Sequence, residues 1–130
     1  MHQIFRELNL TPRQGNNTGP WGGNFYYFYK GQNVCFRWDG AGYDGKSNLV
    51  VIEEELKGVS RLHIEGHLSR IPIMQFFGER IEAIAWIVDK NDFGKLRDVV
   101  ETTCKLLENL LEEKMPRMIY LDSDGESFGV

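Results

Sequence analysis

Two short segments of this chain combine residue types that can do chemistry, and the first is GAGYDGKS at 40–47. It matches the phosphate-binding pattern G-x-x-x-x-G-K-[ST], in which backbone N–H groups surround a phosphate, a lysine reaches the terminal phosphates and a hydroxyl binds Mg²⁺. The defining positions are filled by Gly40, Gly45, Lys46 and Ser47. One alternative function is therefore nucleotide binding.

The residues around this segment favour a different structure. A phosphate loop leads into a helix that would begin at about Lys46, whereas the sequence LVVI at 49–52 favours a strand. Asp44 would also bring negative charge beside the phosphate, and Asp44-Gly45 is a common turn pair between antiparallel strands. We therefore interpret 40–47 as a glycine-rich turn that joins two strands and can touch a partner.

The second segment is HIEGH, which places His63, Glu65 and His67 at alternate positions. On a strand, alternate side chains share one face, so these groups could converge on a metal ion. Neighbouring ligands would then lie about 6–7 Å apart, and a single ion would require a bulge such as Gly66 could supply. A solvated strand face is the competing interpretation, and a metal-binding domain is the weaker alternative function.

Neither cysteine is accompanied by a catalytic partner in the sequence. Cys35 is expected within a strand and Cys104 on the apolar side of a helix, where both would serve packing. With no convergent catalytic set, we expect a non-enzymatic protein without a cofactor.

Aromatic residues concentrate between Trp21 and Tyr43, and Tyr, Trp and Arg are favoured anchors of protein interfaces. Nearby acidic residues, Glu54 and Asp39 among them, would meet a basic partner. The leading hypothesis is a small binding or inhibitory module, for example a toxin-neutralising, immunity-type protein. Its expected partner-binding residues are Trp21, Tyr26, Phe28, Arg37, Tyr43, Asp44, Glu53 and Glu55.

Composition narrows the class of protein. The chain has 130 residues, the size of one domain, and its formal net charge of −4 disfavours nucleic acid as a partner. No apolar run reaches the length of a membrane span, and two cysteines form no disulfide framework. We expect a single cytoplasmic domain over 1–130, and a homo-oligomer formed through an uncovered sheet face would also fit.

These residues must be positioned by an α+β domain of two layers, with a mostly antiparallel sheet of four to six strands packed on one long C-terminal helix. The expected elements are a short helix within 1–12, antiparallel strands over 25–89, the long helix at 91–114, a final strand at 118–121 and a frayed tail at 122–130. The helix prediction rests on apolar residues at helical spacing and on the stop signal of Pro116.

Two hairpins are expected within the strand region. The first joins 25–30 to 33–39 around Gly31-Gln32 and pairs Tyr27 with Phe36, which leaves Tyr26, Phe28 and Arg37 on the outward face. The second joins 49–56 to 59–68 around Lys57-Gly58, although 49–56 is also compatible with a helix.

Overall fold

The main sheet of the protein has five strands in the order β1-β4-β5-β6-β7. The computed structural model describes residues 1–128. The strands are β1 (Thr11–Pro12), β4 (Gly40–Tyr43), β5 (Leu49–Glu55), β6 (Ile81–Val88) and β7 (Arg117–Leu121), with β2 (Asn24–Tyr29) and β3 (Gln32–Arg37) forming a separate hairpin. The helices are α1 (His2–Glu7), α2 (Arg61–Phe76) and α3 (Phe93–Leu111), the last preceded by a 3₁₀ turn at Lys90–Asp92.

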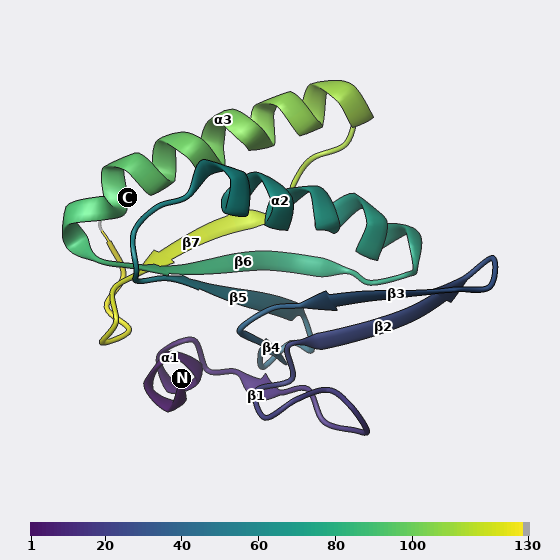
Figure 1. The fold of residues 1–130 in the computed structure, drawn as a ribbon. Coiled ribbons are helices and arrows are strands. Elements are labelled where there is room, and N and C mark those ends of the chain that lie inside the picture. Colours follow the sequence, from purple (N-terminus) through teal and green to yellow (C-terminus); the bar gives the residue numbers. More distant parts are fainter. Residues whose placement is uncertain (129–130) are drawn as a thin grey trace.

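Helices α2 and α3 cover one face of this sheet and α1 lies against the other, while the β2–β3 hairpin extends from the body (Figure 1). Three of the five strand pairings are antiparallel, which confirms the predicted α+β class and the mostly antiparallel sheet. The pairs β5–β6 and β6–β7 are parallel, so the expectation of antiparallel strands throughout 25–89 is wrong for β5 and β6. Both β5 and β6 are buried on both faces, as parallel strands beneath crossover helices usually are.

The expected strand at 59–68 is wrong, because these residues begin helix α2. The Ser60 side chain caps the helix by accepting the backbone N–H of His63 at 3.3 Å, and Gly58 takes a positive φ of 104° just before it. Residues at 62, 64 and 68 fit an alternating pattern as well as a helical one. Ile64, Leu68 and Ile71 decide between the two, because their i, i+4, i+7 spacing gives a fully buried helical stripe.

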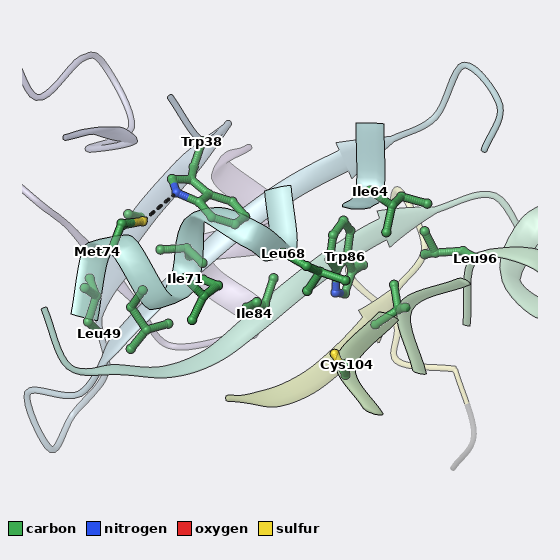
Figure 2. Packing of buried hydrophobic residues seen from close by; sticks show 14 of the residues in the cluster. Trp38, Leu49, Ile64, Leu68, Ile71, Met74, Ile84, Trp86, Leu96 and Cys104 are labelled. Carbon is green, nitrogen blue, oxygen red and sulfur yellow. Dashed lines mark hydrogen bonds between the residues drawn. The ribbon is translucent and has the colours of Figure 1, made fainter. Parts of the chain in front are cut away.

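Successive side chains of β6 point alternately into two hydrophobic clusters, one on each face of the sheet. Ile84, Trp86 and Val88 join the cluster beneath α2 and α3. The smaller Ala83 and Ala85 face α1 instead, together with Ile87. On the α2 side, the Trp38 indole Nε1 donates to the Met74 sulfur at 3.3 Å, and the pair packs beside Ile71 and Leu68 (Figure 2).

Residues of α1 close the second face of the sheet. Ile4 and Phe5 are buried against Val50 and Ile52 of β5. Within residues 1–128 this second face is therefore covered, and the possible homo-oligomer would need another surface.

The β2–β3 hairpin has the expected faces but a register shifted by two residues. Tyr27 pairs with Val34 rather than Phe36, because the turn consists of Lys30 and Gly31, whose φ values are 47° and 78°. Two positive φ angles are typical of a type I′ turn. A two-residue shift preserves the faces of a strand, so Tyr26 still points outward.

The segment expected to be frayed, 122–130, forms a turn within its described part. The Asp122 side chain accepts the backbone N–H groups of Asp124 and Glu126, and Leu121 makes a bridge with Ser127. These short-range hydrogen bonds of the Asp122 side chain explain why the described part of the segment forms a turn. Positions 129–130 lie outside the described residues. Among the described helices, none has the length and apolar character that a membrane crossing requires.

Candidate metal centre

The candidate site lies where the apolar part of β5 ends beneath the first turns of α2. Leu49 and Val51 of β5 face the α2–α3 core, and the period of two places Glu53 and Glu55 on the same face. Both glutamates are buried. A buried carboxylate is costly unless it is paired, so the structure must supply partners at this point.

The partners are two histidines on one face of α2. His63 and His67 are four residues apart, so their side chains are neighbours on the helix surface, and their ring centroids are 4.4 Å apart. Nε2 of His67 lies 2.8 Å from Oε2 of Glu53, and Nε2 of His63 lies 3.1 Å from the same oxygen. One ligand atom from each of the three residues lies within 4.8 Å of the other two.

The other ring nitrogen of each histidine lies near an acceptor. Nδ1 of His67 is 3.0 Å from the backbone carbonyl oxygen of His63, and a carbonyl can only accept, so Nδ1 carries the proton. Nδ1 of His63 is 3.3 Å from Oε1 of Glu55. Both imidazoles are thereby oriented with Nε2 toward Glu53, as in metal sites where the second nitrogen donates to a carboxylate or carbonyl.

The pKa shifts describe a neutral pair at Glu53 and His67. Burial, reinforced by the negative charge of Asp39, raises the pKa of Glu53 to about 8. Burial also lowers the pKa of His67 below its usual value. The two directions agree that a single proton sits between the carboxyl group and Nε2, since two bare acceptors 2.8 Å apart would repel each other. A metal cation could take the place of this proton.

Glu55 has a less complete environment. Its Oε1 is buried and makes no hydrogen bond of good geometry within residues 1–128, and its contact is the 3.3 Å approach of His63 Nδ1. Burial raises the pKa of Glu55, while the charges of His63 and His67 oppose that rise. Because Glu53 approaches Nε2 of His63 and Glu55 approaches Nδ1, the two carboxylates lie on different sides of the ring.

A cleft of about 560 Å³ opens beside the cluster. Its lining residues are Asp39, Glu54, Glu55, Leu56, Lys57, Gly58, Ser60 and His63. The Asp39 backbone N–H donates to Oε1 of Glu53 at 3.3 Å, and its Oδ2 accepts the backbone N–H of Glu54 at 2.7 Å. On the buried side, the Trp38 ring packs edge-on against His67 with centroids 5.0 Å apart.

Two imidazoles and one carboxylate form a donor set that suits Zn²⁺ and similar ions, and three protein ligands leave a fourth position of a tetrahedral site open. Comparisons with protein-family models, curated proteins and solved structures gave no match. The functional interpretation rests on the contacts of this chain's own side chains.

The structure brings together part of the expected His63–Glu65–His67 set. The two histidines converge, but Glu65 is two residues from each of them on a helix and cannot share their face. Glu53 takes its place. The signal that could have found this site is the i, i+4 spacing of the histidines combined with two acidic residues at alternating positions of the preceding strand.

The expected phosphate-binding segment is half strand and half turn. Gly40–Tyr43 is β4 and is antiparallel to β5, so no helix follows. Oδ1 of Asp44 accepts the backbone N–H groups of Lys46 and Asn48 at 2.8 and 2.9 Å, which occupies the donors that a phosphate would need. The geometry thus agrees with a turn and gives the nucleotide alternative no support.

The glycines of this segment have a packing role. A Cβ at Gly40 or Gly42 would lie 3.0 Å from the ring of Phe5, and one at Gly42 would also lie 2.5 Å from the Thr11 carbonyl oxygen. Close approach of α1 to β4 therefore explains the glycines without a phosphate.

The expected partner-binding residues are distributed over several places. Tyr26, Phe28 and Arg37 are exposed on the hairpin. Tyr43 and Asp44 lie at the β4–β5 turn, and Trp21 packs on His2 and Phe5 of α1. The inclusion of Glu53 and Glu55 in an accessible surface is wrong, because both are buried against histidines.

Proposed function

We propose that this protein binds a divalent transition-metal ion of the Zn²⁺ class through Oε2 of Glu53 and Nε2 of His63 and His67. The observation that supports it most strongly is the common direction of the two imidazoles. Nδ1 of His67 is bonded to a carbonyl oxygen, Nδ1 of His63 lies 3.3 Å from Oε1 of Glu55, and both rings turn Nε2 toward the same carboxylate oxygen.

Two of the ligand separations are close to those that such an ion requires. Ligand atoms bound to one tetrahedral Zn²⁺ at about 2.0–2.1 Å lie roughly 3.3 Å from each other. The two observed separations from Glu53 Oε2 are 2.8 and 3.1 Å. The three ligand atoms all lie within 4.8 Å of one another, so binding would move Oε2 slightly away from both rings and draw the two imidazoles together around the ion.

Calorimetric titration of chelator-treated protein with Zn²⁺ tests this function. We expect one ion per chain, and at one hundred times its Kd the ion stabilises the native state by about 2.7 kcal/mol. The His63→Ala variant should lose binding, and because the His63 side chain is 47% exposed the change leaves the core intact. His2→Ala is the matched control, since His2 lies on α1. Equal binding by the His63 variant and the wild type would contradict the assignment.

A second function is favoured by a separate observation on the hairpin. Tyr26 is 50% exposed and Phe28 is 69% exposed, on the outward face that also carries Arg37. We propose that this face binds a protein partner, as a binding or inhibitory module of the immunity type would. The free thiols of Cys35 and Cys104 are consistent with the reducing cytoplasm as its location.

The charge of the hairpin changes the expected partner. Residues 24–37 include Lys30 and Arg37 but no aspartate or glutamate. The partner surface is therefore acidic or neutral, not basic as the whole-chain charge suggested. Affinity capture from cell extract tests this function with the double variant Tyr26→Ala and Arg37→Ala. Leu110→Ala, exposed on α3, is the control, and capture that survives the double change would exclude the hairpin.

A further inference from the structure

We propose that a metal held by Glu53, His63 and His67 keeps one coordination position open toward the neighbouring cleft and there activates water to hydrolyse carboxylic esters and amides. This inference rests on the proposed metal-binding function and assigns a reaction and a substrate class to the same site. Four properties of the site support it: the number of ligands, the access to them, a nearby proton acceptor and the charge of the cleft.

The number of ligands is three. Among the described residues, Glu53, His63 and His67 form the group of possible ligands close enough to share one ion. Glu55 contacts Nδ1 of His63 and so lies behind that ring, away from the ion. Three protein ligands with a water in the fourth position are the usual arrangement of catalytic zinc, whereas structural zinc is closed by four.

Access to the fourth position comes from one side. The side chains of Glu53 and His67 are each 5% exposed, while that of His63 is 47% exposed. Trp38 covers the His67 side of the cluster. His63 is the one of the three ligands that lines the 560 Å³ cleft, so a fourth ligand on the side of His63 would meet a space that can admit a small substrate.

The proton acceptor is the carboxylate of Asp39 at the edge of the cleft. Its backbone N–H binds Oε1 of Glu53 and its Oδ2 accepts from the backbone of Glu54, so two contacts fix the residue beside the cluster. Asp39 itself is exposed, and its side chain lies beside that of Glu53. Its carboxylate can accept a proton from a metal-bound water directly or through one further water.

The charges at the cleft select the substrate. Asp39 and Glu54 are exposed and acidic, and Lys57 is the single lysine or arginine among the described residues that line the cleft. A net negative opening repels phosphate esters and accepts neutral or cationic carbonyl compounds. Leu56 and the Gly58 backbone offer an uncharged wall beside them.

The reaction balances without a further reactant. The water oxygen would bond to the carbonyl carbon, its proton would pass to Asp39, and the carbonyl oxygen would take the electron pair, with a bound ion supplying Lewis-acid stabilisation of the negative charge. The tetrahedral intermediate then re-forms the carbonyl group and breaks the bond to the leaving oxygen or nitrogen. Asp39 returns the proton to that leaving group, so one water is consumed and an acid and an alcohol or amine are released.

The test uses the full chain, treated with chelator and then loaded with Zn²⁺. The two probes are p-nitrophenyl acetate and p-nitrophenyl phosphate. We expect zinc-dependent hydrolysis of the acetate only. Asp39→Asn should slow it by about 10²-fold or more, the usual contribution of a general base. Asp98→Asn, exposed on α3, is the matched control and should keep the wild-type rate.

Metal binding is followed in parallel through the absorption spectrum of the Co²⁺-substituted protein. This measurement separates the claim that the site binds a metal from the claim that it hydrolyses esters. A bound ion without zinc-dependent ester hydrolysis overturns this inference and leaves the metal-binding function standing. Hydrolysis of the phosphate ester overturns the substrate class, and an unchanged rate in Asp39→Asn overturns the role of Asp39. Failure to bind Zn²⁺ or Co²⁺ removes the proposed function and this inference together.

Discussion

Replacing Glu53 by glutamine should change how the stability of the metal-free protein depends on pH. In the folded protein the pKa of Glu53 is raised to about 8 by burial and by Asp39, while its ordinary value is 4.5. Between these values the native state holds a proton that the unfolded chain has lost. The native state therefore binds more protons, and stability falls as pH rises through this window.

The magnitude follows from the same two values. One pKa unit corresponds to about 1.4 kcal/mol, and integration from pH 6 to pH 8 gives a loss of roughly 2 kcal/mol in the wild type. Glutamine does not titrate, and its amide N–H can donate to Nε2 of His67 as the protonated carboxyl group does. The lowered pKa of His67 makes stability rise with pH up to about 6.5, but both proteins share that contribution.

Urea unfolding at pH 6, 7 and 8 in the presence of chelator measures this difference. We expect Glu53→Gln to gain roughly 2 kcal/mol relative to the wild type across the range. The other groups near Glu53 are kept in the variant, namely Asp39, Glu55, His63, His67 and Arg70. Glu54→Gln is the matched control, because Glu54 is the exposed neighbour on the same strand. Parallel pH profiles for wild type and Glu53→Gln would refute the reasoning.

Three further predictions concern the thiols, the core and the glycine-rich segment. Burial raises the pKa of Cys104 to about 12 while Cys35 is exposed, so a thiol reagent should modify one cysteine rapidly, and Cys35→Ser should abolish that phase. Ile64→Ala should destabilise by about 2–5 kcal/mol in urea unfolding, whereas Leu62→Ala, at a position 81% exposed, should change stability by less than about 0.5 kcal/mol. Millimolar Mg²⁺-ATP should leave the melting temperature unchanged, and a clear rise would restore the phosphate-binding reading of 40–47.

Local patterns in the sequence were sufficient to predict those helices and strands whose hydrophobic residues follow a single period. The long apolar stripe of α3 runs from Leu96 to Cys104 with buried residues at helical spacing, and its spacing excludes a strand. In the hairpin, the alternation of Phe25 and Tyr27 with Tyr26 fixed the faces even though the turn was misplaced. The exact register depended on whether Lys30 could adopt a positive φ, which composition does not reveal.

The start of α2 could not be assigned in this way, because its residues satisfy two periods at once. Read with a period of two, His63, Glu65 and His67 share a face; read as a helix, His63 and His67 do so without Glu65. The choice between strand and helix depends on the cap at Ser60 and on the packing of Ile64 in the cluster between α2 and the sheet. Glu53 could not be found from HIEGH alone, since it reaches the histidines only after β5 and α2 pack together.

The geometry of the cluster also argues for a divalent ion over a purely structural network of ion pairs. Without metal, one proton is required between Glu53 and His67, and one more is required at each contact that His63 makes with Glu53 and Glu55. Each of these protons can bridge only one pair of side chains. A single divalent cation brings two positive charges to the point where Nε2 of both histidines and Oε2 of Glu53 converge, and leaves His63 Nδ1–H for Glu55. The ion would thus compensate the charge of the buried Glu53 carboxylate without a shared proton.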